Sequence, residues 1–127
     1  MKLVRWGAAS AEQAGLVDAT GILRDLNSEF ADWSWQTLTP RTLAQVSAVD
    51  TDTLTALPAE TRLGASVFRP GKIVGCALTY GKHAAEAGLE PPEEPMFMLT
   101  AASAINGPND PVMMPQGGTQ LDWEAEL

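Results

Sequence analysis

The sequence predicts an α+β, β-rich fold, and three observations carry this prediction. A short strand and a β-hairpin open the chain, prolines and polar caps then mark short helices, and apolar runs of strand length alternate with turns farther on. With 127 residues the chain has room for one compact domain, or for a small domain and part of another. We expect a small N-terminal domain over residues 1–68 and a second unit over residues 69–127.

The opening residues predict a small sheet. Charged and apolar side chains alternate loosely over residues 2–6, as they do in a half-exposed strand, and Gly7 ends this strand. Two short apolar runs, residues 15–18 and 22–26, flank a turn that contains Gly21, which is the pattern of a β-hairpin. Three strands therefore open the chain.

Short helices are predicted to cover this sheet. Asn27 or Ser28 can cap a helix through residues 29–33, and Pro40 can begin a second helix, with apolar residues following at helical spacing. Asp50 or Thr51 can start a further helical turn. Trp33 and Trp35 could form a ligand platform, but we expect both to fill a small core.

In the second unit the sequence predicts strands that are separated by a helix and a surface connection. The apolar run 72–78 predicts a central strand that is covered on both faces, and the alanine-rich residues 81–88 predict a short helix ended by glycine. Three prolines make residues 89–95 a surface connection. Residues 96–99 then predict a short buried strand, and residues 122–127 a final strand.

Charge and cysteine content exclude several classes of function. The net charge is -8, with eight Lys and Arg against sixteen Asp and Glu, so neither nucleic acid nor an anionic membrane is an expected partner. The single cysteine, Cys76, cannot form an intrachain disulfide or a thiolate metal site, and it favours a reducing compartment. No membrane-length apolar run or signal peptide is present, and we expect a cytoplasmic protein.

Glu124 and Glu126 are candidate metal ligands. In a strand they share one face at roughly 7 Å spacing, whereas Trp123, Ala125 and Leu127 point to the other face. If that face is buried, the two carboxylates need a cation or a proton, and a hard divalent ion suits such oxygen ligands. The alternative is an acidic C-terminal tail in water.

His83 and Glu86 are the candidate catalytic pair. Three residues apart on a helix, they share one face, where the carboxylate could orient the imidazole and raise its basicity so that it activates a water. The alternative is a solvated histidine, with Lys82 and Glu86 forming an ordinary surface ion pair at i,i+4 spacing. Cys76 lies inside a predicted apolar strand, and we expect its side chain to pack in the interior rather than to act as a nucleophile.

The order of these pieces resembles the fumarylacetoacetate hydrolase family. The opening residues 2–5, 15–18 and 23–26 are similar to the small N-terminal domain of its bacterial members. The motifs that carry the resemblance in the second unit are Lys72-Ile73-Val74, residues 78–86, Pro91-Pro92-Glu93-Glu94-Pro95-Met96-Phe97, Ser103-Ala104-Ile105, Gly107-Pro108, Pro115 and Asp122-Trp123-Glu124-Ala125-Glu126-Leu127.

The resemblance implies a β-roll catalytic domain, usually in a homodimer, with Mg, Mn or Ca held by carboxylates. By motif match Glu124 and Glu126 would be metal ligands, His83 and Glu86 the water-activating dyad, and Tyr80 a substrate-binding residue. The implied reaction is metal-dependent hydrolysis of a carbon-carbon bond in a small 2-oxo or 1,3-dicarbonyl acid. Related members instead decarboxylate, isomerise or act as lyases, of the ureidoglycolate lyase type for example.

The chain departs from the family pattern at several positions. Thr79, Ala77 and Lys82 replace the usual Asn, Gly and Asp, and Thr100 stands at the substrate-binding position that usually carries a lysine, whose charge a hydroxyl cannot supply. The family's third metal carboxylate lies on a later strand, so we expect a truncated member with an incomplete β-roll, a weakly bound divalent cation and little or no activity.

Two alternatives stay open. The chain could be a non-catalytic binding or assembly module that associates as a homodimer or through its exposed sheet edge. It could also be an unrelated small acidic domain, in which case the strands predicted after Lys72 should be absent.

Overall fold

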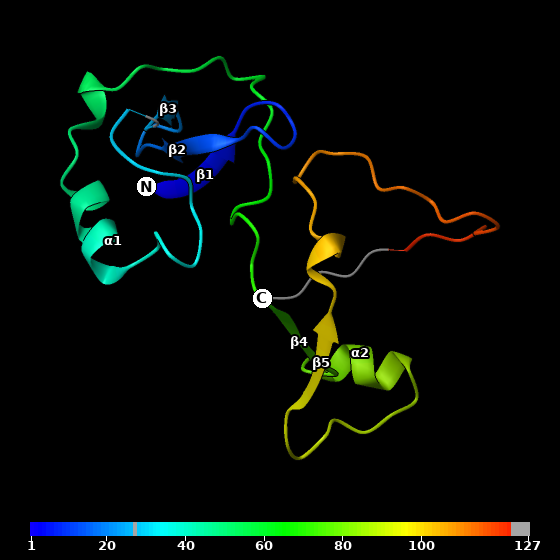
Figure 1. The fold of residues 1–127 in the computed structure, drawn as a ribbon. Coiled ribbons are helices and arrows are strands. Elements are labelled where there is room, and N and C mark those ends of the chain that lie inside the picture. The colour runs from blue at the N-terminus through cyan, green and yellow to red at the C-terminus, as the bar shows by residue number, and fades with distance from the viewer. Residues whose placement is uncertain (27, 123–127) are drawn as a thin grey trace.

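A three-stranded antiparallel sheet begins the chain. The computed structural model of the protein describes residues 1–26 and 28–122 (Figure 1). Strand β1 (Lys2–Trp6) pairs with β2 (Gln13–Val17), which pairs with β3 (Leu23–Asp25), so the sheet order is β1-β2-β3. The register places Leu3 opposite Leu16 and Leu16 opposite Arg24. The predicted strand and hairpin are confirmed.

Asp18 holds the turn of the hairpin. Its Oδ1 accepts hydrogen bonds from the Thr20 hydroxyl at 2.6 Å and from the backbone N–H groups of Thr20 at 2.8 Å and Ile22 at 3.0 Å. Its Oδ2 accepts a bond from Arg24 Nε at 2.9 Å. The Thr20 hydroxyl, joined by Arg24 and the backbone donors, outweighs desolvation and holds the pKa of Asp18 well below its ordinary value of 3.8.

We expect this carboxylate to make folding pH-dependent. A depressed pKa means that the folded state favours the ionised form, so the stabilisation is fully present above pH 3.8 and is lost as the pH falls below that value. Asp18→Asn should lower the urea midpoint at about pH 7 and shrink the drop measured between about pH 7 and about pH 3. Glu60→Gln, at an exposed position, is the control and should change neither value. An unaltered pH profile in Asp18→Asn would contradict this role.

Two helical segments follow the sheet. Helix α1 (Pro40–Ser47) begins with Pro40 at its first position, and the Thr39 side chain accepts a hydrogen bond from the Thr42 N–H at 3.1 Å. The 3₁₀ turn η1 (Thr51–Thr53) begins after Asp50, whose carboxylate accepts a bond from the Asp52 N–H at 3.1 Å. Both predicted starts are confirmed, because each depends on a cap and its own following residues.

The predicted helix over residues 29–33 is wrong. The backbone there bonds to side chains and to a distant segment instead: the Trp33 N–H donates to Asp32 Oδ1 at 2.9 Å, and the Thr37 hydroxyl donates to the Asp32 carbonyl at 2.5 Å. The Trp33 carbonyl accepts a bond from the Phe68 N–H at 2.6 Å. Asp and Thr side chains thus compete with the helical hydrogen bonds, and the segment is an irregular loop that follows a turn at residues 28–29.

The core of this part of the molecule lies between the sheet and the segments that follow it. Trp33 is fully buried, but Trp35 is 71% exposed, so the prediction that both tryptophans fill the core is correct only for Trp33. Trp35 lies in the turn over residues 35–37 and is not part of the buried cluster. The buried cluster consists of Ala14, Leu16, Leu26, Trp33, Val46 and Leu54.

A second, two-stranded sheet is formed by the later part of the chain. Strand β4 (Ile73–Ala77) pairs antiparallel with β5 (Met96–Thr100), helix α2 (Gly81–Glu86) follows β4, and the 3₁₀ turn η2 (Ala102–Ala104) follows β5. These elements lie apart from the first sheet in Figure 1. The strands predicted over residues 72–78 and 96–99 are present, which argues against an unrelated acidic domain. The final strand predicted over residues 122–127 falls, beyond residue 122, outside the described residues, and the domain boundary after residue 68 stays a prediction.

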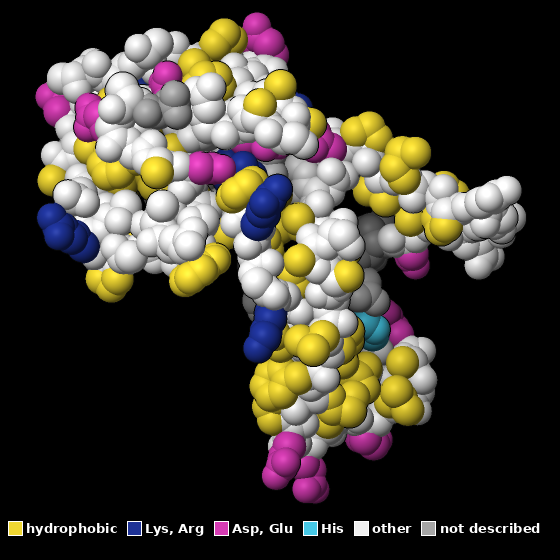
Figure 2. Space-filling view, in the orientation of Figure 1, with side chains coloured by type: hydrophobic (Ala, Val, Ile, Leu, Met, Phe, Trp, Pro, Cys, Tyr) yellow, Lys and Arg dark blue, Asp and Glu magenta, His cyan; other side chains and the backbone are white. Residues whose placement is uncertain are grey.

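The predicted burial of these two strands is wrong for the described residues. β4 pairs only with β5 there and is not central, and Val74 is 55% exposed. Every residue of β5 is exposed, including Phe97 at 73% and Leu99 at 76%. Figure 2 shows the resulting accumulation of hydrophobic side chains on this part of the molecule. A strand is covered on both faces only where further layers pack on it, and β5 has no such cover among the described residues.

Candidate functional site

Helix α2 carries the predicted dyad. The chain leaves β4 through Leu78, which adopts a positive φ of 55°, and enters the helix at Tyr80. His83 and Glu86 lie three residues apart on α2, and so on one side of it, as predicted. The His83 side chain is half-buried, whereas Glu86, the last helical residue, is exposed. The buried Ala84 anchors the helix between them.

The structure does not bring Thr100 to this helix. Thr100 pairs with Ile73 at the start of β4, whereas α2 follows the other end of β4, where Ala77 pairs with Met96. Four residues of strand, about 13 Å, separate these two ends. Tyr80, 43% exposed, lies at the α2 end beside the dyad. The substrate-binding roles of Tyr80 and Thr100 stay predictions, and the two residues lie at opposite ends of the sheet formed by β4 and β5.

The predicted metal ligands Glu124 and Glu126 lie outside the described residues. Within residues 1–26 and 28–122, no three His, Cys, Asp or Glu side chains come together as a possible metal site. The described residues therefore do not by themselves fit a divalent ion.

The most densely bonded charged cluster of the described chain lies elsewhere and was not predicted from the sequence. We call Arg5, Glu12, Asp32, Arg62 and Asp110 the arginine–carboxylate network. Arg5 binds both oxygens of Asp32, at 2.6 and 2.7 Å, and reaches Glu12 at 3.4 Å. Arg62 binds the other oxygen of Glu12 at 3.0 Å and Asp110 Oδ1 at 2.8 Å. Two arginines thus connect three carboxylates that are far apart in sequence.

Arg62 stabilises the charged forms of its partners. Its side chain holds the pKa of Asp110 below the ordinary value. Burial raises the pKa of Glu12, but the hydrogen bond from Arg62 and the charge of Arg5 outweigh it, so the pKa of Glu12 is lowered. The pKa of Arg62 is raised in return. Glu12, Asp110 and Arg62 therefore all favour their charged forms in the folded chain.

The network fastens the residues after β5 onto the first sheet. Gly107 packs so closely there that an added Cβ would lie 2.7 Å from the Leu63 carbonyl oxygen. Leu63 in turn forms an isolated antiparallel bridge with Trp6 of β1. Contacts between residues that are distant in sequence leave no local pattern, so no signal in the sequence indicated this network.

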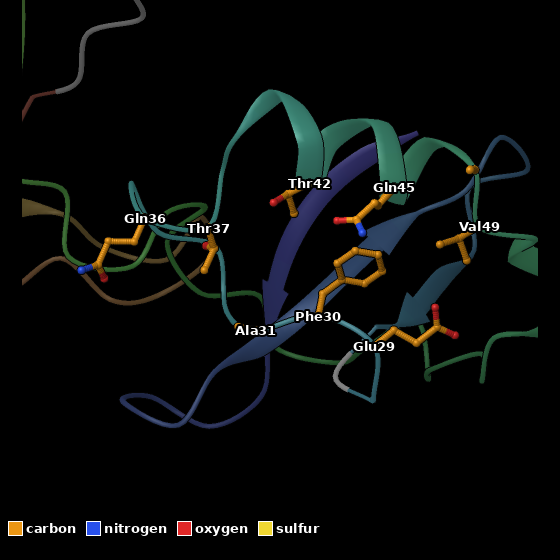
Figure 3. A pocket seen from close by; sticks show the side chains of 9 residues that line it. Glu29, Phe30, Ala31, Gln36, Thr37, Thr42, Gln45 and Val49 are labelled. Atoms are coloured by element: carbon orange, nitrogen blue, oxygen red, sulfur yellow. The ribbon is translucent and has the colours of Figure 1, made fainter.

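Two cavities lie away from the dyad. One, of about 710 Å³, is bounded by α1 and residues 29–37, with Phe30 facing Gln45 of the helix (Figure 3). The other, of about 490 Å³, lies beside the arginine–carboxylate network and is lined by residues of the first sheet, the 65–70 segment and η2. Neither is lined by His83, Glu86, Tyr80 or Thr100.

Comparison with known proteins places the chain next to hydrolases. A protein named Putative hydrolase in Burkholderia ambifaria strain MC40-6 is 42% identical over 127 residues, which are 100% of this chain and 45% of that protein. Proteins of the same name in Burkholderia lata and Burkholderia cenocepacia strain HI2424 match with the same identity and coverage. The chain thus spans about half the length of the curated relatives that it matches.

The family model matches the second unit of the chain. The family described as Fumarylacetoacetate (FAA) hydrolase C-terminal matches residues 72–127, which include β4, α2, β5 and the two glutamates of the predicted metal site. Members of this family generally use a divalent cation. The resemblance predicted from the motif order is therefore confirmed over residues 72–127, which match the fumarylacetoacetate hydrolase family.

Proposed function

We propose that the chain contributes the water-activating residues, and part of the metal site, of a hydrolase that cleaves carbon-carbon bonds in 2-oxo or 1,3-dicarbonyl acids. The observation that carries this proposal is the placement of His83 and Glu86 on one side of α2, within the segment that matches the family. A divalent cation, Mg, Mn or Ca, held by Glu124 and Glu126 would polarise the substrate oxygens when bound. The cytoplasmic location stays a prediction.

The described residues support a role for the dyad in proton transfer. In this proposal the half-buried imidazole of His83 would accept a proton from the attacking water, and Glu86, on the same side of the helix, would be its carboxylate partner. Tyr80, at the entry to the same helix, can bind the substrate. Thr100 supplies only a neutral hydroxyl where the family has a lysine, which favours weak activity or none in this chain alone.

We expect the isolated chain to be inactive towards acetylpyruvate, with or without added Mg or Mn. Two glutamates leave most of an octahedral ion's coordination to water, so calorimetry should detect weak metal binding at most. Hydrolysis by the purified chain that is abolished by EDTA and by His83→Ala would contradict this expectation, and so would tight metal binding.

The hydrolytic role is tested by reconstitution. The chain is mixed with the separately produced remainder of the Burkholderia ambifaria relative in the presence of Mg, and acetylpyruvate hydrolysis is measured. Activity should arise only in the mixture and should fall by about 10²-fold or more in His83→Ala, the usual contribution of general base catalysis. Lys82→Ala, on the same helix, is the control for a surface change. A complex that assembles but keeps its activity in His83→Ala would refute the role of the dyad.

The second candidate function is a non-catalytic assembly module. The exposed apolar residues of β5 favour it, because a strand edge with such residues pairs readily with another chain, and we propose a homodimer formed through this edge.

We expect sedimentation to show a concentration-dependent dimer of the chain. The double change Phe97→Lys and Leu99→Lys should make it monomeric, since a desolvated charge opposes association. Leu43→Lys, at an exposed apolar position on α1, is the matched control and should leave the dimer intact. A wild-type chain that stays monomeric at every concentration would argue against this function.

A further inference from the structure

The groove beside the arginine–carboxylate network has the size of a small-molecule site. Its volume is about 490 Å³, and three separate segments form its walls: the loop after β1, residues 65–70, and residues 102–110. Ligand sites in proteins usually occupy a few hundred Å³ and combine apolar walls with a small number of polar groups. Neither His83 nor Glu86 is among its described lining residues, so the groove is distinct from the dyad.

Two of the strained backbone positions meet in this groove. Ser10 has a φ of 67° and Arg69 a φ of 44°, and both line it. Residues with side chains rarely adopt this left-handed conformation, which costs free energy and often occurs where a side chain is aimed at a ligand. Arg69 is therefore a candidate ligand-binding residue.

Arg69 differs from the other two arginines that line the groove. Arg5 and Arg62 are each bonded to carboxylates of the network. Arg69 is exposed, its guanidinium lies 5.0 Å from the centre of the Phe68 ring, and it forms no ion pair with a described residue. Arg5 lies 5.1 Å from the same ring centre. Stacking on Phe68 orients the guanidinium and leaves its N–H groups available to a planar anion.

The remaining lining groups suit the rest of a small organic acid. Phe68 and Ile105 contribute apolar side chains to the lining, and Ser103 and Asn106 contribute polar ones. The carboxylates of Glu12 and Asp110 would repel an anion, but Arg62 binds both of them and offsets their charge. We propose that this groove binds a small carboxylic acid with an apolar body, with the carboxylate on Arg69 and the body against Phe68.

The test uses the full chain and isovalerate as the probe. The Arg69 Nε–Hε resonance is followed by NMR during titration with isovalerate, isovaleramide, acetate and inorganic phosphate. Isovalerate should give a saturable shift. The neutral amide and acetate should bind about tenfold more weakly or worse, because each lacks one of the two contacts. A shift of equal affinity with the amide, or tighter binding of phosphate, would overturn the assignment to carboxylates.

Variants locate the site. Arg69→Gln should weaken isovalerate binding by about tenfold or more when it is followed by the resonances of Ser103 and Asn106, and Arg69→Lys should recover part of the loss because it keeps the charge without the planar fork. Arg41→Gln, which changes an exposed arginine on α1 outside the groove, should bind as the unchanged chain does. Undiminished binding in Arg69→Gln, in a chain with an otherwise unchanged spectrum, would refute the proposal.

Discussion

Trp33→Ala is expected to abolish the cooperative folding of the first sheet and its covering segments. The indole is fully buried, its N–H donates to the carbonyls of Val4 at 2.8 Å and Gly15 at 3.2 Å, and the Phe30 ring lies 6.0 Å away. Truncation of a buried tryptophan costs about 3–5 kcal/mol. The core of a domain below about 70–80 residues rarely supplies more than about 3–5 kcal/mol of stability, so the loss approaches all of it.

Urea unfolding followed by circular dichroism measures the effect. Trp35→Ala is the matched control, since its indole is 71% exposed, and it should shift the free energy of unfolding by no more than about 0.5 kcal/mol. Trp33→Phe should lie between the two, because it keeps most of the apolar area and loses the N–H donor. Equal effects of Trp33→Ala and Trp35→Ala would show that the buried indole does not organise this part of the chain.

The fold could be predicted from the sequence wherever a short segment determines its own conformation. β1, the hairpin around Gly21, and the starts of α1 and η1 all depend on neighbouring residues, and all were predicted. The helix predicted over residues 29–33 does not form, because the Phe68 N–H and a local side chain bond to the backbone groups that a helix would use. A distant partner of that kind leaves no mark on the segment itself.

Burial was predicted less well than strand formation, for a related reason. The apolar composition of β4 and β5 correctly indicated strands, but composition does not say what covers them. Phe97 and Leu99 are typical of a buried strand, yet in the described residues they face solvent. Their coverage depends on a partner, whether a second copy or a further part of a complete hydrolase, which is the question that the dimer and reconstitution experiments address.

The candidate site residues were likewise placed correctly only where local spacing determines their position. Helical spacing alone was enough to place His83 and Glu86 on one side of α2. The relation of Thr100 to that helix depends on strand register, which put the residue at the opposite end of the ribbon. The arginine–carboxylate network joins residues such as Arg62 and Asp110, 48 positions apart, and no pattern in the sequence pointed to their pairing.

Arg5→Met should destabilise the chain nearly as strongly as the loss of Trp33. Arg5 is only 4% exposed, its two bonds to Asp32 form a bidentate pair, and Nη1 also donates to the Ala65 carbonyl at 3.2 Å. Breaking a buried ion pair by removing one partner costs about 3–5 kcal/mol, because the other charge stays buried without compensation. Asp32 retains some solvent contact, so we expect the lower end of that range.

Comparing a double variant with the single one tests whether the uncompensated charge causes the loss of stability. If the uncompensated carboxylate causes the loss, the double change Arg5→Met and Asp32→Leu should be more stable than Arg5→Met alone, although it removes more native contacts. Arg41→Met, on the surface of α1, should be nearly neutral. Hydrogen exchange at the Phe68 N–H should rise in Arg5→Met, since Arg5 holds the 65–68 segment through Ala65 and the Phe68 ring. A double variant less stable than the single one would mean that Arg5 acts through packing rather than through its charge.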